Sequence, residues 1–158
     1  MWMVKMKFFI LLFAVSLCLG FINASAGIAL RATSVKGQLN CGTKPYEGAF
    51  VRLFRSSGKE DTNEILDTRM TSPTGLFHVE GNTNGRPLNE TDIDAYVRVY
   101  HKCGLDEKKN EYRKFGFKIP SQYVTNGRIA KKTYDVGILN LEIKYPKETK
   151  DKKFVENP

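Results

Sequence analysis

The chain has 158 residues and carries 25 Lys and Arg against 17 Asp and Glu, so its formal net charge at pH 7 is +8. This length suits a single domain that can bury a core without help from a metal ion. Beyond the first twenty residues no stretch is apolar enough to cross a membrane, which excludes a protein with several membrane spans.

The first 26 residues have the form of a secretory signal peptide. Lys5 and Lys7 precede an apolar run over residues 8–19, and small residues at 24–26 offer a cleavage site after Ala26. An uncleaved anchor is the alternative, but the run is shorter than the ~20 residues that a spanning helix needs. We therefore expect a signal peptide over 1–26, a secreted, extracellular protein and no transmembrane segment.

Cleavage of this leader would remove Cys18 and leave two cysteines, Cys41 and Cys103. In an oxidising compartment two cysteines most simply form one disulfide. Cleavage would also remove two of the positive charges and leave a net charge of +6.

Apolar residues then alternate with polar ones in short runs, as in two-sided strands. Val51 and Leu53, for example, oppose Arg52 and Phe54. No run has a sustained helical stripe, and Gly and Pro lie between the runs. The spacing predicts an antiparallel β-sandwich in residues 27–146, with seven strands over 35–41, 49–54, 65–70, 76–79, 93–99, 112–119 and 133–145. The expected inward residues are Val51, Leu53, Ile93, Val97, Val99 and Leu139.

The positive charge is confined to the last third of the chain. Residues 27–101 carry nine basic and nine acidic side chains, whereas residues 102–158 carry fourteen and eight. An ordinary solvated surface is one interpretation, and contact with an anionic partner is the other. Secretion argues against nucleic acid and leaves anionic lipid headgroups, sulfated glycans or acidic proteins. The candidate contact residues are Lys108, Lys109, Arg113, Lys114, Arg128, Lys131 and Lys132.

The residues that could support catalysis or bind a metal ion are few. His78 and His101 are isolated histidines on strands, which more often form ordinary hydrogen bonds than act as catalytic bases. His101 and Cys103 face the same way, but two ligands do not complete a zinc site and a disulfide removes the thiolate. With no nucleophile-elbow motif, we expect no enzyme, no cofactor and no metal.

One modification site is expected. Asn89-Glu90-Thr91 is a glycosylation sequon in a polar, turn-rich loop, so Asn89 is the predicted acceptor.

Six segments follow one another in a fixed order along the chain. They are Val35-Lys36-Gly37-Gln38-Leu39-Asn40-Cys41 followed by Pro45, Val51-Arg52-Leu53, Thr74-Gly75-Leu76-Phe77, Tyr100-His101-Lys102-Cys103, Ile119-Pro120 with Tyr123-Val124, and the run from Lys132 to Glu142. In this order they resemble those of the nematode transthyretin-like family. The likeness covers nearly all of the chain after the leader and implies a transthyretin-like, or prealbumin-like, sandwich. It names a fold more firmly than an activity.

The chain also departs from this resemblance. Many similar proteins carry a second cysteine pair, but here residues 110–113 and 149–152 contain no cysteine. The basic tail over 147–158 should therefore be untethered and mobile. The related hydroxyisourate hydrolases end in Tyr-Arg-Gly-Ser, which this chain lacks, and residues that would form a thyroxine channel cannot be matched.

The interpretation that these observations favour is a non-enzymatic binding module. Its basic last third would contact anionic surfaces such as phosphatidylserine-type lipid or sulfated glycan. The alternatives are a carrier of a small apolar ligand and, less favoured, a hydrolase related to hydroxyisourate hydrolase.

Overall fold

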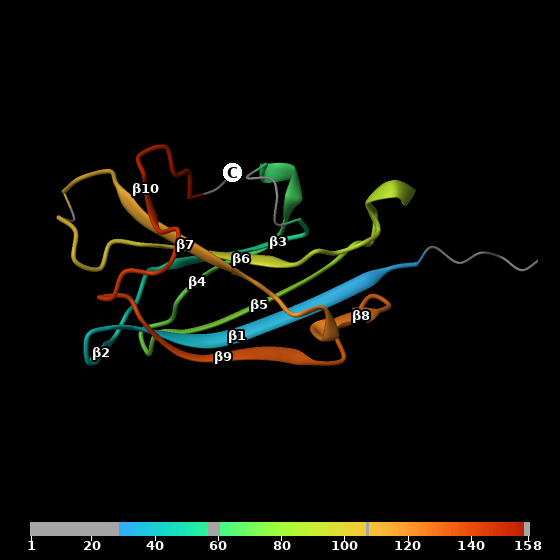
Figure 1. Ribbon diagram of the computed structural model, residues 1–158, viewed down its shortest axis with the longest axis horizontal. Helices are drawn as coiled ribbons and strands as arrows, with labels where there is room; N and C mark the ends of the chain where they lie inside the picture. The colour runs from blue at the N-terminus through green and yellow to red at the C-terminus, as the bar shows by residue number, and fades with distance from the viewer. Residues whose placement is uncertain (1–28, 57–60, 107, 157–158) are drawn as a thin grey trace, which may run out of the picture.

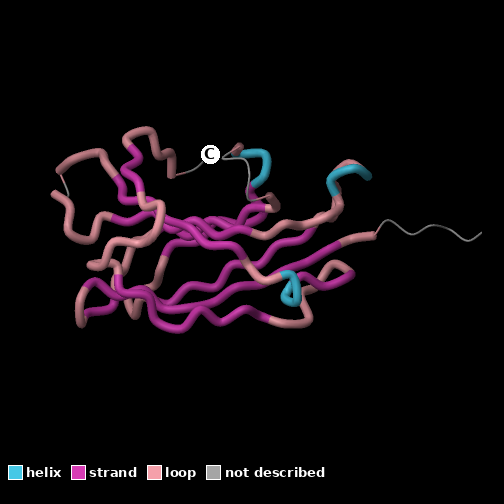
Figure 2. Tube along the Cα trace, viewed as in Figure 1, coloured by secondary structure: helices cyan, strands magenta, loops and turns pink. Residues whose placement is uncertain are grey.

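The computed structural model describes residues 29–56, 61–106 and 108–156, and the expected signal peptide lies outside this range. Two sheets of strands pack face to face, and short 3₁₀ turns lie at the periphery (Figures 1 and 2). The turns are η2 (Thr62–Glu64), η3 (Leu88–Glu90) and η4 (Ser121–Tyr123). The all-β sandwich expected from the sequence is confirmed.

The first sheet is built around the long strand β1 (Arg31–Cys41). Strand β5 (Leu76–Asn82) pairs with it antiparallel and β9 (Thr133–Asn140) pairs with it parallel. Residues 34–36 pair with both neighbours, so β5 and β9 lie on opposite edges of β1. The short strands β2 (Lys44–Pro45) and β8 (Val124–Asn126) extend the two ends of this sheet.

The second sheet is antiparallel throughout, in the order β10-β7-β6-β3-β4. Its strands are β3 (Phe50–Phe54), β4 (Ile65–Met70), β6 (Tyr96–His101), β7 (Tyr112–Lys118) and β10 (Thr149–Asp151). Strand β6 is central and pairs with β3 on one side and with β7 on the other.

The core lies between the two sheets and uses the face that the alternation predicts. Five of the six expected inward residues are buried, and Leu139 is half-buried against the same cluster. Beyond the end of β9, Leu141 is fully buried. Burying each Leu or Val of this kind stabilises the fold by roughly 1.5–3 kcal/mol.

The strand predicted over 133–145 ends at Asn140, and its alternation is interrupted by a bulge. The register between β1 and β9 shifts between Lys36 and Gln38, opposite Gly137. Gly137 has φ of 69°, a left-handed conformation that glycine adopts without a steric penalty. The extra residue changes which side chains face outward, so Ile138 lies on the solvent side and Leu139 faces the core.

The C-terminal segment is docked, which differs from the untethered tail that we expected. Residues 149–151 form β10 on the edge of β7, and Lys150 Nζ lies 3.1 Å from Glu111 Oε2. Farther along, Phe154 is only 9% exposed. The two segments without the second cysteine pair are therefore side by side, joined by a backbone ladder and an ion pair. The tail was expected to be mobile because it lacks the second cysteine pair, but the single aromatic residue Phe154 anchors it.

Candidate functional site

The predicted basic residues divide between opposite ends of the sandwich. Lys108 and Lys109 lie in the loop after Cys103, which is bonded to the end of β1. The backbone carbonyl of Arg128 instead accepts from Asn82, which pairs with the start of β1. Since β1 has 11 residues and a strand rises about 3.3 Å per residue, the two groups are roughly 30 Å apart. They cannot form one contact surface.

Two of the predicted contact residues belong to the structure of the fold. The side chains of Arg113 and Lys114 are only 13% and 16% exposed, and they form ion pairs with Glu148 at 2.6 Å and with Asp151 at 3.5 Å. A paired, mostly buried cation has little charge to offer a surface ligand. This placement differs from the exposed contact surface that we expected for these two residues, because the segment that leads into β10 pairs with them and covers them.

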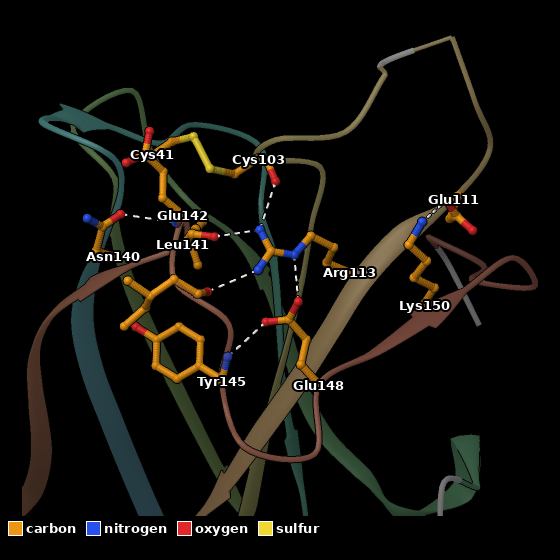
Figure 3. A network of polar contacts seen from close by, with 11 residues as sticks. Cys41, Cys103, Glu111, Arg113, Asn140, Leu141, Glu142, Tyr145, Glu148 and Lys150 are labelled. Atoms are coloured by element: carbon orange, nitrogen blue, oxygen red, sulfur yellow. Dashed lines mark hydrogen bonds and ion pairs between the residues drawn. A yellow bond between two sulfur atoms is a disulfide. The ribbon is translucent and has the colours of Figure 1, made fainter.

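Arg113 joins three segments at the disulfide end of the molecule (Figure 3). Its Nε donates to Glu148, Nη1 donates to the carbonyls of Cys103 and Leu141 at 3.1 and 2.8 Å, and Nη2 donates to that of Ile143 at 3.0 Å. The second carboxylate oxygen of Glu148 accepts from the backbone of Tyr145 at 3.1 Å. Burial alone would raise the pKa of Glu148, but these hydrogen bonds and the Arg113 charge hold that pKa below its usual range.

The disulfide between Cys41 and Cys103 is present, with Cα atoms 5.9 Å apart. It links the end of β1 in one sheet to the residues just after β6 in the other, and it closes a loop of 62 residues. The pairing predicted from the cysteine count is confirmed.

His101 is a core residue and not a surface one. It is 0% exposed, lies edge-on to Tyr46 and Phe115, and neither ring nitrogen has a hydrogen-bond partner among the described residues. Burial, reinforced by the nearby Arg113 charge, lowers its pKa from 6.5 to about 4. A histidine that is neutral and sealed in this way has no route to a substrate.

An open groove of about 890 Å³ runs along the outer face of the first sheet. Its floor consists of cross-strand rows contributed by β5, β1 and β9 in turn. The row at one end is Leu76, Gln38 and Ile138, and the next is His78, Lys36 and Asp135.

The apolar end of the groove is formed by Leu76 and Ile138, the two partners of Gln38. They are 55% and 65% exposed, which is unusual for large apolar side chains that face each other across a groove. Because of the bulge at Gly137, Asp135 and Ile138 both face this groove although they are three residues apart. In the sequence, the signal for this bulge is Gly137, two residues after Asp135.

The middle of the groove is polar and electrically balanced. Lys36 Nζ lies 3.4 Å from Asp135 Oδ2, and both side chains are more than half exposed. His78 Nε2 lies 2.7 Å from the Ser34 hydroxyl, which also accepts from Thr133 at 3.2 Å. Ser34 is only 1% exposed, so its hydroxyl is not accessible as a nucleophile.

The far end of the groove leads to a cationic turn. Thr133 lines the groove, and Lys131 and Lys132 come directly before it, with Arg128 in the same turn. These three side chains are exposed and form no ion pair with any described residue. The Glu80 carboxylate lies beside this turn and accepts from the backbone N–H of Ala130 at 3.4 Å. From Ile138 to Lys132, just before β9, the surface thus passes from apolar to cationic over roughly 20 Å.

The remaining predicted site lies elsewhere on the surface. Asn89 is exposed within η3, which places the acceptor of the sequon in solvent. Its glycosylation stays a prediction.

Within the described ranges, no group of three or more His, Cys, Asp or Glu side chains is placed to hold a metal ion. In the same ranges no helix is long and apolar enough to cross a membrane.

The two sheets, joined at one end by the disulfide, define an all-β sandwich. Comparison with known proteins identifies the family: the transthyretin-like family matches residues 36–120, and the chain belongs to it. Transthyretin-like protein 46 of Caenorhabditis elegans is 34% identical over 145 residues, which span 92% of this chain and 75% of the relative. Transthyretin-like protein 2 of the same organism is 35% identical over 121 residues, 76% of this chain and 81% of the relative. The recognition made from the segment order is confirmed, and membership suggests a binding-type module.

Proposed function

We propose that this chain is a secreted, non-enzymatic module that binds an anionic amphiphile along the groove of the first sheet. The acyl chain would lie on Leu76 and Ile138, and the anionic headgroup would lie toward Lys131 and Lys132. The single observation that carries the proposal is the position of the groove between an apolar row at one end and, at the other, the exposed cationic turn directly before its lining residue Thr133.

The magnitudes suit an amphiphile better than either a purely charged or a purely apolar ligand. Covering two half-exposed apolar side chains contributes about 1 kcal/mol each. Each Lys near an anionic surface contributes ~1 kcal/mol. Neither contribution suffices alone, but a molecule that uses both gains from both. The apolar row favours an acyl chain over a sulfated sugar, which has nothing to place there.

A hydrolase function receives less support from the same geometry. The Ser34 hydroxyl is covered, and His78 has no carboxylate partner among the described residues to orient it as a base. The groove offers recognition groups without an accessible nucleophile.

The test uses a fluorescent fatty acid and the uncharged alcohol of the same chain length, each titrated into the full protein at two salt concentrations. We expect the acid to bind at least ten-fold more tightly at low salt. This advantage should shrink as the ~8 Å screening length at physiological ionic strength shortens further, while the alcohol barely responds. Equal affinities of the acid and the alcohol at low salt would show that the cationic turn does not contribute to binding. Saturable binding of heparin without any acyl binding would favour a glycan ligand.

A further inference from the structure

The outer face of the second sheet carries aromatic and arginine side chains where a solvated sheet face would ordinarily be polar. On β3 and β6 the outward residues form three directly opposed pairs: Phe50 with Tyr100, Arg52 with Arg98, and Phe54 with Tyr96. Their alternation with the core-facing valines and leucines puts all six on one side. Arg52 is only 6% exposed and Tyr100 4%, so this face is covered.

The cover is the chain's own C-terminal segment (Figure 1). The ring of Phe154 lies 4.4 Å from that of Tyr100, 4.6 Å from Tyr112 and 5.2 Å from Phe50, measured between centroids. The Arg52 guanidinium lies 4.4 Å from the Phe154 centroid, a cation–π contact. One aromatic side chain therefore fills a pocket formed by three aromatic rings and an arginine.

The backbone of the segment is recognised as well. Arg52 Nη2 donates to the carbonyls of Val155 and Glu156, the latter at 3.1 Å. The Tyr112 hydroxyl donates to Glu156 Oε1 at 3.1 Å. An aromatic anchor, two carbonyls and a carboxylate two residues later are together the features by which proteins recognise short extended peptides.

A bend joins the covering segment to β10. Lys152 and Lys153 are exposed and form a bend, fixed by a hydrogen bond of 2.9 Å from the Lys153 backbone to Asp151 Oδ1. Opening at this bend would leave the β10–β7 ladder and the Lys114–Asp151 ion pair in place. In the docked state Arg52 Nε has no hydrogen-bond partner in the described part of the chain, so the arginine retains an unused donor.

We propose that the face formed by Phe50, Arg52, Tyr100 and Tyr112 is a peptide-docking site that residues 154–156 occupy in cis. Its partner is a protein with an extended segment in which an aromatic residue precedes an acidic residue by two positions, as in Phe154-Val155-Glu156. The site lies on the sheet opposite the groove and does not depend on the proposed function. Because the tethered segment has a high effective concentration, a free peptide can enter only when the cis anchor is weakened.

The test measures binding of a labelled peptide with the sequence of residues 152–158 by fluorescence anisotropy. The protein is the full chain, as wild type and as Phe154→Ala. We expect Phe154→Ala to bind the peptide at least ten-fold more tightly than the wild type does. A peptide with Ala in place of its Phe has the same charge and should not bind. Adding Arg52→Met to Phe154→Ala should abolish binding.

Three results would overturn the proposal: no peptide binding by folded Phe154→Ala, equal binding of the two peptides, or binding that survives Arg52→Met. Near-ultraviolet circular dichroism shows whether each variant is folded. Should Phe154→Ala unfold, Glu156→Ala provides the same test, since it removes the acceptor of the Tyr112 hydrogen bond and keeps the anchor. We then expect a measurable gain of peptide binding over wild type, and its absence in folded protein would count against the site.

Discussion

Arg113 donates to Glu148 at 2.6 Å, and this pair fixes the disulfide end of the sandwich. The arginine comes from β7, the glutamate from the loop before β10, and the carbonyls of Cys103 and Leu141 complete the contact. Four hydrogen bonds from one guanidinium thus hold the loop after β9, whose own residues 142–144 are exposed. The Arg113–Glu148 pair thus ties this loop to β7.

Arg113→Ala should therefore destabilise the protein by about 3–5 kcal/mol, because it leaves a buried carboxylate and three carbonyls without their donor. Arg113→Lys should recover only part of this loss, since one ammonium group cannot reach all four acceptors. The free energy of unfolding from urea denaturation is the measurement. Arg128→Ala, an exposed arginine, is the matched control and should change it by less than 0.5 kcal/mol. A loss below 1 kcal/mol for Arg113→Ala would show that the network contributes little.

The disulfide can be checked directly on purified, unreduced protein. Intact mass measurement with an alkylating agent should find neither Cys41 nor Cys103 reactive before reduction. Replacing both by Ala should cost about 4 kcal/mol on the chain-entropy account of a loop this long. Two alkylated cysteines in unreduced protein would contradict the bridge.

The buried imidazole makes stability depend on pH in a defined window. Unfolded His101 takes up a proton near pH 6.5, whereas the folded chain resists protonation until about pH 4. Its folded pKa is depressed and the neutral form is the folded one, so its contribution is complete above pH 6.5 and is lost as the pH falls toward 4. The total is on the order of 3 kcal/mol.

His101→Leu removes this titration while keeping the side chain apolar and of similar size. We expect the slope of unfolding free energy between pH 7 and pH 5 to be nearly flat in the variant and positive with pH in the wild type. That window avoids the Glu148 carboxylate, whose lowered pKa makes its own contribution disappear only at more acidic pH. An unchanged slope in His101→Leu would assign the pH dependence to other groups.

The core assignment can be checked at the central strand. Val97 is 0% exposed, so Val97→Ala should cost about 1–3 kcal/mol through lost burial and the cavity left behind. Ile129→Ala removes more carbon from a side chain that is 74% exposed and should cost less than 0.5 kcal/mol. Equal midpoints for the two variants would mean that the inward face of β6 has been assigned one residue out of register.

Sequence alternation was sufficient for the sandwich because the core needs an apolar side chain at every second residue of each strand. It placed Val51, Val97 and Val99 correctly and found β4 to the residue. Sequence alternation fails in β9, where a bulge interrupts the two-residue period. The bulge at Gly137 adds one residue to β9, so Val136 and Leu139 both contact the core although they are three residues apart, and no strict alternation over 133–145 fits the strand.

The candidate site was harder to predict, because a count of charges along the sequence does not show where their side chains lie in the fold. The charge count predicts one surface for seven basic residues, yet the Arg113 side chain is only 13% exposed and Lys108 lies at the opposite end of the sandwich from Lys132. Only the parallel pairing of β1 with β9 aligns Ile138, Asp135 and Thr133 into one groove. Parallel pairing joins segments about a hundred residues apart, and local sequence patterns do not specify it.

The division of the basic residues between two ends provides the most direct test of the proposed function. Lys131→Gln with Lys132→Gln removes two charges beside the groove, and Lys108→Gln with Lys109→Gln removes two charges at the opposite end. The measurement is the Kd of the fluorescent fatty acid at low salt for both variants and for the wild type. Since each Lys contributes ~1 kcal/mol near an anionic group, the first variant should bind about 30-fold more weakly and the second within about two-fold of wild type. Equal affinities of the two variants would contradict a ligand held between the apolar row and the cationic turn.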